Sequence, residues 1–240
     1  MPLDPNFIAV VAIVFFAFFT QAATGFGGMV IALTVSALLF PVPLLLGWFV
    51  PLVILISSYL LIRHHAHINW PLFFKKILPA MGLGLVIGQF LFYSLQGELL
   101  KKGLGVLIVA LAARELLRKA DAPRNIPLLP WTFAAGIVHG VFATGGPLLV
   151  YGLNGQGLPK SEFRSTLALV WLVMAVVLLT SYISSGQLTA TSLPQIGILA
   201  ATLPFSIALG EWVHSRINAQ LFQRLINALL VFCGLVLLIK

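Results

Sequence analysis

Long apolar runs separated by short polar turns dominate the pattern along this chain of 240 residues. The runs occupy approximately residues 7–40, 43–62, 71–95, 99–117, 129–153, 166–184, 190–210 and 219–239. Most of them are close to the ~20 residues that a membrane-spanning α-helix requires. They do not show the alternation of apolar and polar positions that marks the strands of an outer-membrane barrel. The pattern predicts an all-α integral membrane protein with eight apolar segments.

Two of these runs are interrupted by glycines at corresponding places, within residues 24–28 and 143–147. An offset of 118 residues carries Gly28 onto Gly146 and Gln21 onto His139. We therefore predict two divergent repeats, each beginning with a broken helix that three further helices follow. The first repeat spans residues 1–120 with its broken helix at 7–40, and the second spans 121–240 with its broken helix at 129–157. Paired broken helices at corresponding positions are typical of a midplane binding site in a secondary transporter.

Composition supports the membrane prediction. Hydrophobic residues make up 60% of the chain and charged residues 8%, with a mean hydropathy of +1.07, whereas a soluble domain carries about 25% charged residues. The formal net charge is +8, but the basic residues lie in short turns and form no stripe or arm, so we do not expect nucleic acid as a partner. The single cysteine excludes an internal disulfide.

The distribution of Lys and Arg bears on topology, because short cytoplasmic loops are enriched in both. If all eight segments cross the bilayer, the 14 basic residues divide eight to six. If the first and fifth segments are re-entrant hairpins, only Lys101, Lys102 and Lys240 lie opposite the other eleven. The charge bias therefore favours three full crossings per repeat, hence inverted repeats with both termini outside the cytoplasm.

A broken helix inside hydrocarbon exposes backbone N–H and C=O groups that need partners. Where the helix restarts at Gly27–Gly28, and again at Gly146–Pro147, the free N–H groups carry the positive end of the helix dipole. Pro147 suits a first helical turn, because proline lacks the N–H. Glycine also lets an oxyanion approach the backbone closely. The two breaks together predict a site for a small anion.

The alternative is that the glycines only permit close helix packing. We expect that role for Gly82, Gly84 and Gly88 in the third segment. At the two breaks, the repetition and the adjoining Thr, Gln and His exceed what packing requires.

The motifs from Gln21 to Gly28 and from His139 to Pro147, together with the eight apolar segments, resemble the TauE/SafE family of sulfite and organosulfonate transporters. The likeness covers essentially the whole chain. It implies transport of a sulfur-containing anion, such as sulfite or sulfoacetate, by a multi-pass protein of the bacterial inner membrane. The residues alone imply only a small anion.

The candidate substrate-binding residues surround the two breaks, and His139 is the one histidine within an apolar segment, where an ionisable residue is a candidate for function. The alternative for His139 is a neutral ring that bonds a neighbouring helix. The full set is Gln21, Thr24, Gly25, Gly27, Gly28, His139, Thr144, Gly145 and Gly146. Tyr151, Asn154 and Arg164 are candidates for an access vestibule, although Arg164 would also serve as a topology-setting charge paired with Glu162.

Other functional classes are less well supported. The sequence contains no nucleophile elbow, zinc-protease helix or membrane-buried aspartate pair, so we do not expect an enzyme. We predict no cofactor, and no Walker loop is present to use ATP. The histidines at 64, 65 and 67 suggest a metal-ion permease only weakly, and we expect no metal site. An anion channel is the main alternative, because glycine-rich broken segments also build conduction filters. We expect a secondary transporter that works by alternating access, with a homodimer contact on the remaining helices.

Overall fold

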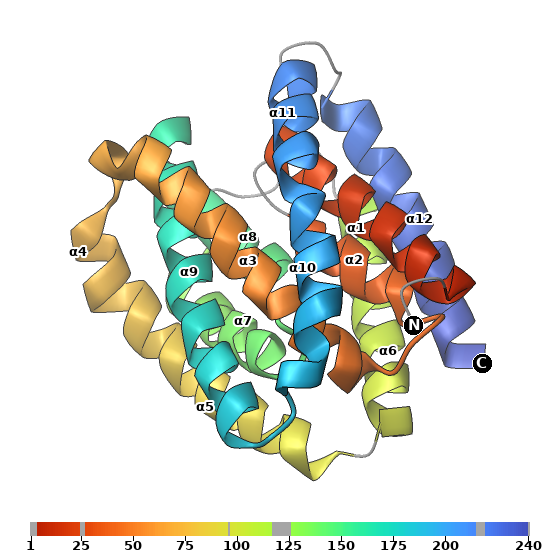
Figure 1. Ribbon diagram of the computed structural model, residues 1–240. Helices are drawn as coiled ribbons and strands as arrows, with labels where there is room; N and C mark the ends of the chain where they lie inside the picture. The colour runs from red at the N-terminus through yellow and green to blue at the C-terminus, as the bar shows by residue number, and fades with distance from the viewer. Residues whose placement is uncertain (1–3, 25–26, 96, 117–125, 215–218, 240) are drawn as a thin grey trace. The chain divides into compact units, whose positions relative to one another are not determined.

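The computed structural model describes the chain except for residues 1–3, 25–26, 96, 117–125, 215–218 and 240 (Figure 1). Within the described residues, the secondary structure is entirely helical. The first half contains α1 (Pro5–Thr24), α2 (Gly28–Ser36), α3 (Val42–His64), the 3-10 turn η1 (His65–His67), α4 (Trp70–Leu72), the π-helical turn η2 (Phe73–Ile77), α5 (Leu78–Ser94) and α6 (Gly97–Leu116). The second half contains α7 (Leu128–Phe142), α8 (Gly146–Asn154), α9 (Lys160–Ser184), the 3-10 turn η3 (Ala190–Ser192), α10 (Leu193–Ala201), α11 (Leu203–His214) and α12 (Ala219–Ile239). The all-α prediction is confirmed.

Several helices are long and apolar enough to cross a bilayer. Among the described residues there are five, namely Pro5–Ala23, Val42–Arg63, Trp70–Ser94, Ser161–Ser184 and Ala190–Trp212. Helix α7 has 15 residues and so measures about 22 Å at 1.5 Å per residue, less than a hydrocarbon core of ~30 Å. The two predicted hairpins therefore begin differently, since α1 is long enough to span the core and α7 is not.

Helix bounds in the two halves correspond under the 118-residue offset. Helix α2 maps onto α8, because Gly28 moves to Gly146 and Ser36 moves to Asn154. The start of α3 at Val42 likewise moves to Lys160, where α9 begins. Each of α2 and α8 has nine residues, or about 14 Å, roughly half of the hydrocarbon thickness. The inverted repeats themselves stay a prediction.

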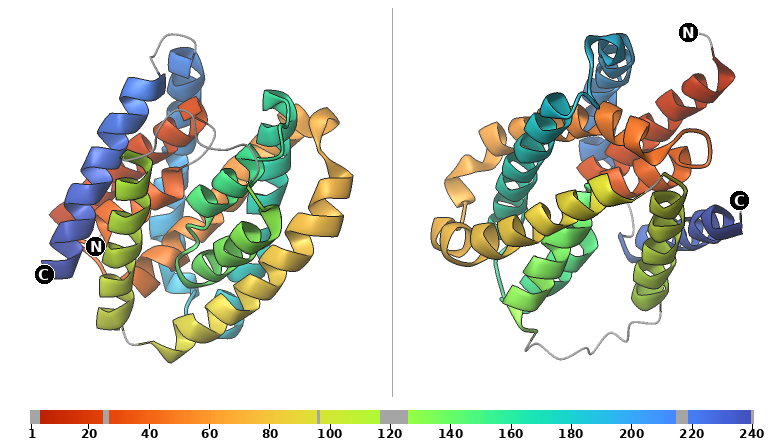
Figure 2. Two further views of the ribbon diagram at one scale, coloured as in Figure 1. Left: turned by 180° about the vertical axis from the view of Figure 1, so that it is seen from behind. Right: turned by 90° about the horizontal axis from the view of Figure 1, so that it is seen from below.

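The helices group into two compact units, each of which combines segments from both halves of the sequence. Unit 1 contains residues 1–49, 95–122 and 191–240, and unit 2 contains residues 50–94 and 123–190. In unit 1, α1 packs along α11 and α6 packs along α12. In unit 2, α5 packs along α7, with α8 beside α7 (Figure 2). In each unit, the longer part of a broken segment thus lies against a helix from the other half.

Glycines bring α5 and α7 into close contact. A Cβ on Gly88 would lie 2.8 Å from the Cα of Gly140, and a Cβ on Gly84 would lie 3.0 Å from the Cα of Gly136. Residues four apart share one face of a helix, so the two pairs form a matching strip of small residues of the kind that joins membrane helices. The predicted packing role is confirmed for Gly84 and Gly88.

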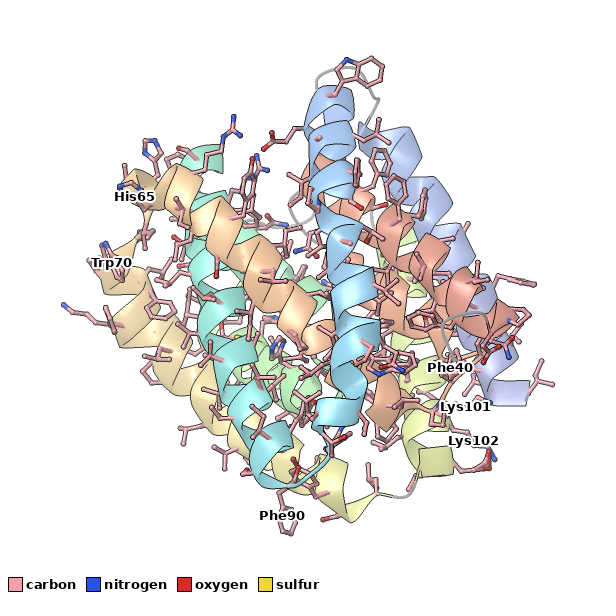
Figure 3. All side chains as sticks on the ribbon, in the orientation of Figure 1. Phe40, His65, Trp70, Phe90, Lys101 and Lys102 are labelled. Atoms are coloured by element: carbon pink, nitrogen blue, oxygen red, sulfur yellow. The ribbon has the colours of Figure 1, made fainter. Side chains whose placement is uncertain are left out.

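The same prediction is wrong for Gly82. A Cβ at this position would meet no atom within 4 Å, because Gly82 lies on the other side of α5 from Gly84. The neighbouring side chains on that side are exposed and apolar, as expected of a surface that faces lipid. Leu83 and Val86 are examples, and Phe90, which is 73% exposed, points away from the helices (Figure 3).

We expect Gly88→Ala and Gly140→Ala to destabilise the protein by about 1–3 kcal/mol each, because the added methyl meets backbone that cannot move aside. Gly82→Ala, on the same helix as Gly88, is the matched control and is expected to leave the melting temperature unchanged or higher. Thermal unfolding of the detergent-purified variants measures the difference. Equal melting temperatures for Gly82→Ala and Gly88→Ala would contradict the close packing.

Candidate functional site

The second break lies where α7 ends at Phe142 and α8 begins at Gly146. Ala143 adopts the left-handed conformation with φ 53°, and its N–H donates to the His139 carbonyl at 2.7 Å. A non-glycine residue with positive φ is uncommon and often marks a constrained position. The chain then doubles back onto α7, since a Cβ on Gly145 would lie 3.0 Å from the Cβ of His139. Glycine is required here to allow that approach.

His139 is buried beside this break, with 2% of its surface exposed. Its ring stacks on the indole of Trp171 from α9, with centroids 5.7 Å apart and planes 20° apart. Neither ring nitrogen has a hydrogen-bond partner in the described structure. A neutral imidazole carries one donor and one acceptor nitrogen, so both are available to a bound molecule. Among the described residues, the His139 ring therefore forms no hydrogen bond to a neighbouring helix, contrary to the alternative.

Thr144 provides a second unpartnered group at the same place. Its hydroxyl is buried and has no hydrogen-bond partner in the described structure. A buried hydroxyl without a partner costs about 1–3 kcal/mol on the scale of protein mutational data. Two such groups, one on each side of the chain reversal, are consistent with an occupant that accepts hydrogen bonds.

The start of α8 completes this cluster. The first N–H groups of any helix have no partner within the helix, and Pro147 in the first turn of α8 contributes none. A Cβ on Gly146 would lie 3.7 Å from the indole of Trp171. The indole therefore covers both the imidazole and the first residue of α8. Trp171 thus lies against two of the candidate residues, His139 and Gly146.

The first break, in unit 1, has a similar local arrangement. Gly27 caps α2 in the left-handed conformation, with φ 93°. A Cβ on Gly28 would lie 2.8 Å from the Cβ of Gln21 and 3.0 Å from the carbonyl oxygen of Ala17. Gln21 is buried, with 5% of its surface exposed. Helix α2 thus begins directly against the face of α1 that carries Ala17 and Gln21.

The contacts at the two breaks involve equivalent positions of the preceding helices, although the contacting glycine is Gly28 at the first break and Gly145, the counterpart of Gly27, at the second. At the second break, a Cβ on Gly145 would lie 3.0 Å from the carbonyl carbon of Ala135 as well as from His139. The 118-residue offset carries Ala17 onto Ala135 and Gln21 onto His139. Each returning chain therefore packs on the same two positions of its preceding helix.

Two of the predicted residues at the first break cannot be compared with this geometry. Gly25 lies outside the described residues, as does the side chain of Thr24, which is the last residue of α1. The candidate site of unit 1 therefore consists of Gln21, Gly27 and Gly28.

The predicted vestibule residues lie on α8 and α9 of unit 2. Tyr151 is half-buried and packs edge-on against Trp131 of α7, with ring centroids 4.7 Å apart. Asn154 is exposed at the end of α8. Arg164 is half-buried, and its Nε has no hydrogen-bond partner in the described structure.

The expected pairing of Arg164 with Glu162 is not formed among the described residues. The Glu162 carboxylate instead accepts a hydrogen bond from the side chain of Asn69. Asn69 also caps α4 through Leu72, and its backbone N–H donates to Thr166 at 3.0 Å. Glu162 therefore joins α9 to the turn before α4.

Of the three histidines that follow Arg63, the side chain of His64 lies outside the described residues. Among the side chains that the structure does describe, no group of three metal-ligating residues occurs. His65 and His67 are exposed, and His65 points outward from the turn η1 that follows α3 (Figure 3). The Nδ1 of His65 lies 3.0 Å from the carbonyl oxygen of Ile62.

Sequence reasoning missed Gln89 on α5. Its side chain is buried, and Nε2 donates to the Gly140 carbonyl of α7 at 2.5 Å. Its Oε1 accepts from Ser181 of α9 at 2.7 Å. The one available signal is a glutamine within an apolar segment, which requires hydrogen-bond partners in a bilayer.

Comparison with known proteins agrees with the architecture. Residues 10–237 match the family model described as "Sulfite exporter TauE/SafE". A curated relative, the "Probable inner membrane transporter protein TsaS" of Comamonas testosteroni, is 28% identical over 165 residues, which cover 66% of this chain and 68% of that protein. No solved structure matches the chain. The chain therefore belongs to the TauE/SafE family of membrane transporters of sulfur compounds, and it is a multi-pass protein of the inner membrane.

Proposed function

We propose that this protein is a secondary transporter that moves a small sulfur-containing anion, such as sulfite or an organosulfonate, by alternating access around a site formed by the two helix breaks. The observation that carries the proposal is the cluster at the second break. There, the buried His139 ring and Thr144 hydroxyl lack hydrogen-bond partners within the described structure and adjoin the start of α8.

The groups at this break suit an oxyanion. The imidazole N–H, the Thr144 hydroxyl and the free N–H groups of the α8 start all donate hydrogen bonds. The N-terminus of a helix also favours negative charge through its dipole. Sulfite and sulfonate groups present several acceptor oxygens around one sulfur, so one headgroup can receive several of these bonds at once. The family description, which names sulfite, supports sulfur as the central atom.

The first break supports a two-part site. Its contacts involve Ala17 and Gln21, at the positions that correspond to Ala135 and His139. Matching helix breaks in two halves of a chain are the arrangement by which many secondary transporters hold a substrate near the bilayer midplane. We infer that Gln21, Gly27 and Gly28 supply the second part of the anion site, and that the inverted repeats provide the alternating access.

The first test is anion binding by the purified protein. Because a ligand that binds only the native state raises apparent stability, one of sulfite, sulfate, sulfoacetate, taurine and acetate is expected to raise the melting temperature. His139→Phe should abolish that shift, because phenylalanine keeps a ring against Trp171 but removes both nitrogens. Its melting temperature without anion should stay close to that of the wild type.

The outcomes separate the alternatives. A shift that persists in His139→Phe would place the anion elsewhere. In proteoliposomes, saturable flux with exchange of substrate across the membrane would support a carrier. Flux that does not saturate and far exceeds carrier turnover would support the channel alternative.

The second test addresses the first break. Gly28→Ala is expected to weaken anion binding at least about tenfold, because the new methyl must displace the Gln21 side chain or the start of α2. Gly197→Ala is the matched control in unit 1, since a Cβ on Gly197 of α10 would meet no atom within 4 Å. Isothermal titration with the anion that stabilises the wild type measures both affinities. Equal affinities for the two variants would remove the first break from the site.

A further inference from the structure

A hydrogen-bonded chain of side chains supports the second break from outside the anion-binding groups. In a continuous helix, the carbonyl of Gly140 would accept the N–H of residue 144. Helix α7 ends before that bond forms, because Ala143 turns into the left-handed conformation. The Gly140 carbonyl receives the Nε2 of Gln89 instead. The glutamine side chain thus replaces a backbone donor that the break removes.

The orientation of the Gln89 amide is fixed at its other end. The Ser181 hydroxyl donates to Oε1 at 2.7 Å, so Nε2 must face α7. The Ser181 hydroxyl also lies 3.0 Å from the Tyr93 hydroxyl, which in turn donates to Ser185 at 3.0 Å. Helices α5, α7 and α9 of unit 2 are therefore joined through one amide.

Close packing leaves the amide little freedom to move. Gln89 directly follows Gly88, whose Cα faces Gly140, and a Cβ on Gly140 would lie 2.9 Å from the backbone nitrogen of Gln89. The Gln89 side chain has 8% of its surface exposed. The carbonyl that it binds belongs to the residue next to His139. Displacement of Gln89 would therefore disturb the main chain at Gly140, one residue from the imidazole that is proposed to bind the anion.

We propose that Gln89 is a positioning residue for the anion site, and that Ser181 acts through it. Gln89 holds the last turn of α7 so that His139 and Thr144 keep their places beside the start of α8. This inference rests on the proposed function, since the positioned groups are the proposed anion donors. Gln89 itself does not contact the anion.

The test compares Gln89→Met with a matched control. Methionine keeps the length and apolar stem of glutamine but removes both hydrogen-bonding ends. Thr132→Val is the control, because the hydroxyl of the buried Thr132 of α7 donates within its own helix, to the Leu128 carbonyl at 2.9 Å, and forms no other hydrogen bond among the residues that the structure describes. Hydrogen exchange of the purified protein without anion is measured by mass spectrometry. We expect faster exchange confined to residues 140–149 in Gln89→Met and no such change in Thr132→Val.

Anion affinity provides the second measurement. Gln89→Met is expected to weaken binding about tenfold, the effect typical of losing a group that orients a ligand-binding residue. Ser181→Ala is expected to weaken binding less, and to have no further effect when added to Gln89→Met. Such non-additivity is the signature of two residues that act through one interaction.

The exchange measurement distinguishes failure of this inference from failure of the proposed function. Faster exchange at the break, with no anion bound by the wild type, would refute the anion site but keep Gln89 as the support of the break. Normal binding and exchange in Gln89→Met would refute the positioning role. Faster exchange along the whole of α5 and α7 would show a general structural role and would also refute it, as would additive effects of the two substitutions on affinity.

Discussion

Within a bilayer, a backbone N–H or C=O without a partner costs several kcal/mol, because lipid offers no hydrogen bonds in place of water. This constraint governs both broken segments. At the second break, the Gln89 side chain donates a hydrogen bond to the Gly140 carbonyl, which has no helical partner because the helix is interrupted. The free N–H groups at the start of α8 face the opposite need, since they require acceptors. At the second break, the protein thus provides a donor to the freed Gly140 carbonyl, whereas in the proposed function a bound anion provides the acceptors.

The hydrogen bond from Gln89 to the Gly140 carbonyl depends on how closely α5 and α7 approach each other. The small residues at positions 84, 88, 136 and 140 let α5 and α7 meet backbone to backbone. That approach places Gln89 within reach of α7, because a glutamine side chain could not span a wider gap while its other end still bonded Ser181. The packing glycines on α5 and the polar support of the break are therefore parts of one arrangement, although neither belongs to the substrate-binding set.

The sequence predicts local features well and contacts between distant segments poorly. The helical character, the restart of a helix at Gly146 and the close packing of Gly84 and Gly88 all follow from patterns within a few residues. Gly82 was wrongly grouped with them, because composition does not reveal which side of α5 meets α7. Gln89 was missed because its partners lie 51 and 92 residues away. Glu162 accepts a hydrogen bond from Asn69, which is 93 residues away, so this contact also could not be predicted from neighbouring residues. The repeats and the membrane topology stay predictions.

In the proposed function, recognition of the anion through main-chain groups would limit how the substrate preference can change. A main-chain N–H at the start of α8 is present whichever side chain the residue carries, so no point mutation other than one to proline deletes it. New preferences would therefore have to arise at the flanking side chains, above all at Trp171, whose indole covers both His139 and Gly146. Relatives with the same glycines but a smaller residue at that position would be expected to accept bulkier anions while binding the same charged headgroup.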